Sequence, residues 1–183
     1  MKVPSCLRYL PLLYMAVFFS FFSVSQSQDK SIVRLVSIDT ALTIPALNGK
    51  AIIAHEKKLF EAYLEENFVN WGLNKSGLAT SQTKVQVYEL ISNGTLIQMF
   101  AGITTDLDKL VMSQNQVINF CRKYPQLLSK EGYTNFLLKE NAEYFVASVC
   151  MSVDGLLVYV SRLGNSDVLY ANWIHRVVVP QLA

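Results

Sequence analysis

The sequence predicts an α+β domain in which N-terminal helices pack on one face of a C-terminal antiparallel sheet of four or five strands. Two observations predict this fold class. Apolar residues over 45–129 recur mainly at helical spacing, whereas residues 133–182 are rich in aromatic and β-branched side chains with turn residues between them. The length of 183 residues suits a single domain, over 28–183, with a lead-in at 28–44 that the pattern does not assign.

Residues 1–27 have the order of a secretory signal peptide, with a basic start, an apolar run over 9–24 and small residues near the end. Cleavage after Ser25 or Ser27 fits that order and predicts an exported protein, periplasmic or extracellular. The alternative is an uncleaved anchor helix, although the run is shorter than the roughly 20 residues that a spanning helix needs. No later segment is as apolar, so we expect no membrane span in the mature chain.

Charge is sparse and balanced once the leader is set aside. The chain has 16 Lys and Arg against 14 Asp and Glu, and two of the bases lie in the leader, which leaves 16 − 2 = 14 of each sign. A neutral chain lacks the basic surface that nucleic acid needs, so we expect no nucleic-acid partner. Charged residues make up 16% of the chain, against about 25% in typical domains, which favours another protein or a second copy as the partner.

The strongest helical pattern covers 49–71, where apolar residues fall on one arc and Gly72 provides an end. Residues 83–92 are ambiguous, because Val85 and Val87 alternate like a strand. We favour a helix that ends at Asn93-Gly94, and a hairpin turning there is the alternative.

Two further helices are predicted from their first turns. Thr95 is placed to cap a short helix that runs through Phe100. Ser113 and Gln116 have the spacing of a capping box, which predicts a helix that Pro125 ends or bends.

The predicted strands share aromatic and β-branched composition, and they cover 133–138, 144–152, 156–162, 168–172 and 174–179. Asp154-Gly155 is a hairpin signal between the second and third strands. The run from Gly164 to Asp167 is another, so we expect an antiparallel meander.

The stretches SQNQVINFC and HRVVVPQL, within residues 113–182, resemble uncharacterised domains of predicted bacterial proteins. The resemblance implies a bacterial α+β domain. It implies no activity, because no established function or catalytic motif comes with it.

The mature chain keeps two cysteines, Cys121 and Cys150, and an exporting compartment would allow a disulfide between them. Cys121 falls within the apolar arc of its predicted helix, whereas Cys150 falls on the less apolar face of its strand. The two sulfurs would then lie on opposite sides of the sheet, which favours two buried thiols over a disulfide.

Catalytic and metal motifs are absent from the sequence. His55-Glu56 lacks the second histidine of a zinc-protease motif, so we expect no metal and no cofactor. Glu56 projects from the apolar stripe of the helix predicted at 49–71. We hypothesise a structural ion pair with Arg176, or a contact with His175, across the interface between helix and sheet. The alternatives are an exposed carboxylate and a functional acid or base.

The function predicted best is that of a non-catalytic binding or protein-interaction module. One alternative is a small exported enzyme with its site around Glu56, His55 and His175, and another is a structural component of an envelope assembly. Sequons at Asn74 and Asn93 are no more than composition gives by chance. Five aromatic residues are read mainly as core, with a ligand site as the alternative, and they are Trp71, Tyr88, Tyr159, Tyr170 and Trp173.

Overall fold

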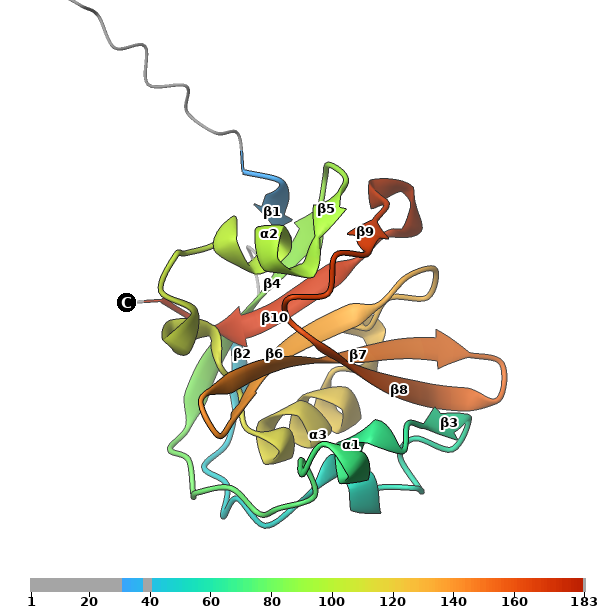
Figure 1. Ribbon diagram of the computed structural model, residues 1–183. Helices are drawn as coiled ribbons and strands as arrows, with labels where there is room; N and C mark the ends of the chain where they lie inside the picture. The colour runs from blue at the N-terminus through green and yellow to red at the C-terminus, as the bar shows by residue number, and fades with distance from the viewer. Residues whose placement is uncertain (1–30, 38–40, 183) are drawn as a thin grey trace, which may run out of the picture.

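The computed structural model describes residues 31–37 and 41–182, and the predicted leader at 1–27 lies outside this part of the chain. The described residues form a mixed eight-stranded sheet, a separate two-stranded sheet and three α-helices (Figure 1). Within these ranges, no helix combines the length and the apolar character needed to cross a bilayer.

The strands are β1 (Val33–Leu35), β2 (Leu42–Ile44), β3 (Tyr63–Leu64), β4 (Thr83–Leu90), β5 (Gly94–Thr95), β6 (Thr134–Glu140), β7 (Glu143–Ser152), β8 (Gly155–Arg162), β9 (Val168–Leu169) and β10 (Arg176–Pro180). The helices are α1 (Asn67–Asn70), α2 (Leu96–Ala101) and α3 (Gln114–Lys123). The described part of the chain also contains four 3₁₀ turns, and they are η1 (Ile53–His55), η2 (Leu107–Leu110), η3 (Pro125–Leu127) and η4 (Ala171–Trp173).

The main sheet has the strand order β1-β4-β10-β6-β7-β8-β3, and β2 also pairs with β4. Only β6, β7 and β8 form a meander of consecutive antiparallel strands. The last strand, β10, is inserted between β4 and β6 and runs parallel to β6. Three successive valines of β10 are fully buried, because a central strand covered on both faces is apolar throughout.

The predicted fold class is therefore wrong: the chain is mostly β, and its sheet is mixed and wider than a four- or five-stranded meander. The region 45–129 is not mainly helical, since it contains β3, β4 and β5. In place of the helix predicted at 49–71, the chain forms η1, β3 and α1. Its apolar residues Ile52, Phe60 and Phe68 still reach one core, but Ile52 and Phe60 do so from non-helical backbone and Phe68 from the short helix α1.

Residues 83–92, whose sequence fits both a helix and a strand, form a strand over most of their length. Residues 83–90 of this segment form β4, and the side chains of Val85 and Val87 are buried in the core on one face of the sheet. The period-two alternation decided the structure, because β4 buries its side chains within a sheet rather than along a helical stripe. Asn93-Gly94 makes no hairpin with β4, since β5 begins at Gly94 and pairs with β9.

Three local predictions are confirmed. Ser113 and Gln116 form a capping box at the start of α3, and Thr95 caps α2 in the same way. Asp154-Gly155 turns the chain between β7 and β8, where Ser152 pairs with Gly155. The second hairpin, predicted at residues 164–167, does not form, because β9 leaves the sheet to pair with β5.

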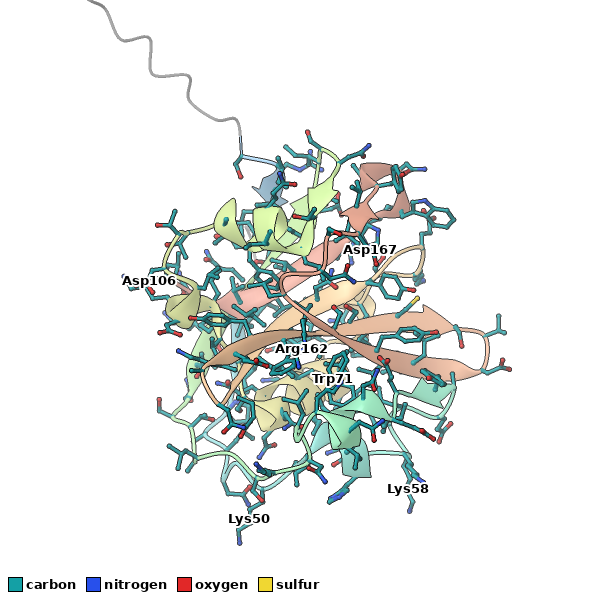
Figure 2. The ribbon with its side chains drawn as sticks, viewed as in Figure 1. Lys50, Lys58, Trp71, Asp106, Arg162 and Asp167 are labelled. Atoms are coloured by element: carbon teal, nitrogen blue, oxygen red, sulfur yellow. The ribbon has the colours of Figure 1, made fainter. Side chains whose placement is uncertain are left out.

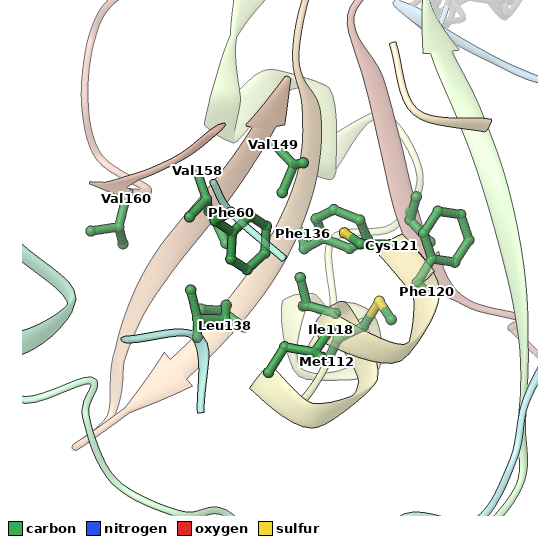
Figure 3. Close-up of a cluster of buried hydrophobic side chains, with 14 of the residues drawn as sticks. Phe60, Met112, Ile118, Phe120, Cys121, Phe136, Leu138, Val149, Val158 and Val160 are labelled. Atoms are coloured by element: carbon green, nitrogen blue, oxygen red, sulfur yellow. The ribbon is translucent and has the colours of Figure 1, made fainter. Parts of the chain in front are cut away.

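Both faces of the sheet are covered, which corrects the expectation of helices on one face only. On one face, α3 and residues from the segment 42–73 bury the side chains of Phe136 and Leu138 (Figure 3). On the other face, α2 and η2 pack against Leu137 and Val177. Alternation along each strand thus supplies two separate cores.

Candidate functional site

A pocket of about 350 Å³ lies on the α2 side of the sheet, at the end of β6 and β7 that α2 leaves uncovered. Residues 131–133, just before β6, form one wall, and Cys150 of β7 contributes to the lining. Residues 168–170, Trp173 and His175 form the rest of the lining. Segments remote in sequence are therefore brought together by the insertion of β10 next to β6.

Large apolar side chains of this pocket are exposed. The exposed fraction is 48% for Val168, 55% for Tyr170 and 56% for Trp173. The spacing of both aromatic residues in the sequence favours the core. A concave site ringed by exposed aromatic side chains is instead typical of ligand binding.

His175 is the buried polar group of the site, with 5% of its surface exposed. Its Nδ1 atom accepts a hydrogen bond of 3.2 Å from the backbone N–H of Tyr133, whose ring stacks on the imidazole with centroids 5.8 Å apart. Burial lowers the pKa of His175, so the ring is neutral and carries its proton on Nε2. Among the described residues, none accepts a hydrogen bond from that N–H.

The wall beside His175 is held in a fixed shape. A Cβ atom on Gly132 would lie 2.0 Å from the carbonyl oxygen of Trp173, so only glycine fits there. Ser129 Oγ accepts from the backbone N–H of Gly132 and donates to the carbonyl of Ile174. Asn93 Oδ1 accepts from the backbone N–H of Ala171 and fixes the start of η4.

Ile174 has φ 50° and ψ 54°, a left-handed conformation that a β-branched residue adopts only when its surroundings impose it. This residue lies between Trp173 and His175, both of which line the pocket. The strained backbone therefore fixes where these two side chains project.

The aromatic surface continues beyond the pocket. The rings of Tyr133 and Tyr159 are nearly perpendicular with centroids 6.0 Å apart, and the Tyr159 ring lies 5.1 Å from that of Tyr63 on β3. By contrast, Trp71 and Tyr88 pack against the cores.

The two cysteines are free thiols, and they lie on opposite faces of the sheet, Cys121 in the α3-side core and Cys150 in the pocket. Cys121 is buried against α3-side residues, and burial raises its pKa to about 12. Cys150 is half-buried in the pocket, where burial also raises its pKa. Neither sulfur is therefore a ready nucleophile, because nucleophilic attack needs the thiolate.

The remaining predicted site residues are not brought together. Glu56 follows η1 and pairs with Arg122 of α3 rather than with Arg176. Arg176 instead lies 3.5 Å from a carboxylate oxygen of Glu89 on β4. The expected pair assumed a helix over 49–71, and without that helix Glu56 does not face β10. His55 is exposed at the end of η1, and only His175 lines the pocket.

A second pocket, of about 340 Å³, lies beside the first turn of α3. The capping box occupies the donors there, since Ser113 Oγ accepts from the Gln116 backbone N–H and Gln116 Oε1 accepts from that of Ser113. Among the residues with described positions, no group of three His, Cys, Asp or Glu is placed to hold a metal ion.

Nothing in the sequence indicates Glu131, Gly132 and Tyr133 as site residues, because no local pattern marks a turn that meets a distant segment. The aromatic residues of the run from Tyr170 to His175 are a usable signal, but the composition of that run predicts strands. No protein-family model matches the chain, and no curated protein or solved structure matches it either.

Proposed function

We propose that this protein is a non-catalytic binding domain whose ligand is a small, largely apolar molecule held in the pocket beside η4. The observation that carries the proposal is the exposure of Tyr170 and Trp173 around a cavity that His175 also lines, whose Nε2–H donates to none of the described residues. The cavity volume falls within the range of roughly 300–1,000 Å³ that is common for small-molecule sites.

Two features favour binding over catalysis. Burial raises the pKa of Cys150 and lowers the pKa of His175, so both side chains are kept in their neutral forms. A catalytic pair would instead need the thiolate and the imidazolium. The Cys150 thiol donates to the carbonyl of Met151, not to the imidazole.

A sheet edge is a less suitable binding surface. The backbone N–H of Val160 on β8 donates to a carboxylate oxygen of Glu65 at 2.6 Å, and β3 pairs with the preceding part of this strand. A partner strand would have to displace these contacts, whereas the pocket is already open.

NMR titration with 2-acetylnaphthalene, a flat apolar probe, tests the proposal. The amide signals of Gly132, Tyr133 and His175 should shift with a single dissociation constant, while that of Ile118 in the α3-side core should not. Trp173→Ala should weaken binding about tenfold, because the ring forms one wall of the site.

Val153→Ala is the matched control, since Val153 is fully exposed on the β7–β8 turn outside the pocket. Trp71→Ala is a second control, because Trp71 lies outside the pocket, packed on Phe145 and close to Arg162 (Figure 2). The proposal fails if this probe and related bicyclic fragments leave the pocket amide signals unchanged. It also fails if Trp173→Ala binds the probe as tightly as Val153→Ala does.

We also infer from the leader that the ligand is met outside the cytoplasm. N-terminal sequencing of the protein recovered from its host tests this. A mature start near residue 26 or 28 supports export, and an intact Met1 contradicts cleavage.

A further inference from the structure

We propose that the ligand is an organic cation with a methylated ammonium group, which sits among the rings of Tyr133, Tyr170 and Trp173 with the Glu131 carboxylate at the rim. This inference rests on the proposed function and adds the chemical class of the ligand. Three observations support it: the negative charge of the lining, the aromatic rings of the pocket, and the lack of a lysine or arginine over these rings among the described residues.

The charge of the lining favours a cation. Glu131 is exposed, and it forms no ion pair with any residue that the structure describes. The lining contains neither lysine nor arginine. His175 adds no positive charge, because burial lowers its pKa. Among the described residues of this lining, the only formal charge is therefore negative, whereas Lys130 and Arg176 line another cavity that shares Glu131.

The rings favour the same class of ligand. The face of an aromatic ring carries partial negative charge and attracts cations, most strongly for tryptophan. Tyr133 is held by two other rings, because His175 stacks on one of its faces and Tyr159 is nearly perpendicular to it, at 88°. Trp173 and Tyr170 are more than half exposed, so a ligand reaches them without first displacing protein atoms.

Other aromatic residues of this chain already have a cation. The guanidinium carbon of Arg162 lies 5.5 Å from the Trp71 ring centre, and Lys139 Nζ lies 5.1 Å from that of Tyr144. Within the described residues, the rings of the pocket have no such partner. The position that a lysine or arginine fills elsewhere is thus open to a ligand.

Methylation of the ammonium group follows from the apolar part of the lining. Val168 and Leu169 offer no hydrogen-bond acceptor through their side chains, and Glu131 is a single carboxylate. A primary ammonium would lose hydrogen bonds to water that this lining replaces only in part. A trimethylammonium group has no N–H to satisfy, and its methyl groups pack against apolar side chains.

The decisive experiment compares choline with 3,3-dimethylbutan-1-ol, which has the same shape but carbon in place of the charged nitrogen. NMR titration of the full mature chain should give choline an affinity about tenfold higher. Glu131→Gln and Trp173→Leu should each lower the affinity for choline several-fold and leave that for the neutral alcohol nearly unchanged. Glu66→Gln is the control, because Glu66 is an exposed carboxylate at the start of α1, outside the pocket.

Each outcome decides the inference. Preferential binding of choline, reduced by both pocket variants and not by the control, supports it. Equal affinities for the two probes overturn the charge argument and leave the pocket as a site for apolar ligands. If neither probe binds but 2-acetylnaphthalene does, the ligand class is wrong and the proposed function stands. If all three fail, both proposals fall.

Discussion

Replacement of Gly132 by alanine tests the architecture of the pocket most directly. The added Cβ would lie 2.0 Å from the carbonyl oxygen of Trp173 and 3.2 Å from Nδ1 of His175. Ordinary contact begins near 3.4 Å, so the Trp173 carbonyl would have to retreat by about 1.4 Å. Ile174, which is already strained, leaves little freedom for that movement.

Overpacking of this kind costs about 1–3 kcal/mol of unfolding free energy. For a chain of this size, a loss of about 2 kcal/mol lowers the melting temperature by roughly 4–8 °C. The Gly132→Ala variant should also bind 2-acetylnaphthalene more weakly, because the Trp173 wall is displaced.

Urea denaturation followed by circular dichroism measures the loss, and Gly164→Ala is the matched control. A Cβ on Gly164 meets nothing within 4 Å, so that variant should be neutral or more stable by up to about 1 kcal/mol. If Gly132→Ala unfolds within 0.5 kcal/mol of wild type, roughly the spread of neutral substitutions, and binds the probe normally, the close approach is refuted.

Three further perturbations test other parts of the structure. Ala142 has φ 65° in the two-residue turn between β6 and β7, after Asn141, so Ala142→Gly should add about 1 kcal/mol of stability, and a lower melting temperature would contradict this. Ser113→Ala should cost about 1 kcal/mol by removing the α3 cap, and Ser113→Asp should restore most of it in the same urea assay. Because burial lowers the pKa of His175, the unfolded chain binds a proton at this residue more readily than the folded chain does. Stability should therefore be full above about pH 6.5 and fall as the pH drops toward the lower pKa of the folded state. His175→Asn should flatten this profile, whereas replacing the exposed His55 should not; a similar slope in both variants would assign the effect to other groups.

The sequence predicted the local features whose determinants are contiguous. The Ser113 capping box needs only residues within one helical turn, and the Asp154-Gly155 turn needs only the two strands that it joins. Both hydrogen-bond patterns close over a few residues, so they formed where they were predicted.

The helix predicted at 49–71 failed because spacing alone does not distinguish a helical stripe from an irregular chain crossing one core. Ile52 and Ile53 are adjacent β-branched residues, which lower helix propensity, and both are buried in the same core. The contacts of Phe60 and Phe68 with that core overrode the helical spacing.

The candidate site depended on long-range pairing. Tyr133 and Arg176 are brought alongside each other by the parallel pairing of β6 and β10, and this places Trp173 and His175 against Gly132. Parallel neighbours leave no turn signal in the sequence, because the chain between them is long.

The sequence by itself determined the caps, the β7–β8 turn and the alternation that separates the two faces of β7, since each follows from neighbouring residues. Tertiary structure alone decided that the final valine-rich strand occupies the middle of a mixed sheet. It also decided that Tyr170 and Trp173, which the sequence pattern assigns to a core, line a pocket. The physical reason is that burial is a property of the assembled sheet: the same apolar side chain is core or surface according to which distant segment covers it.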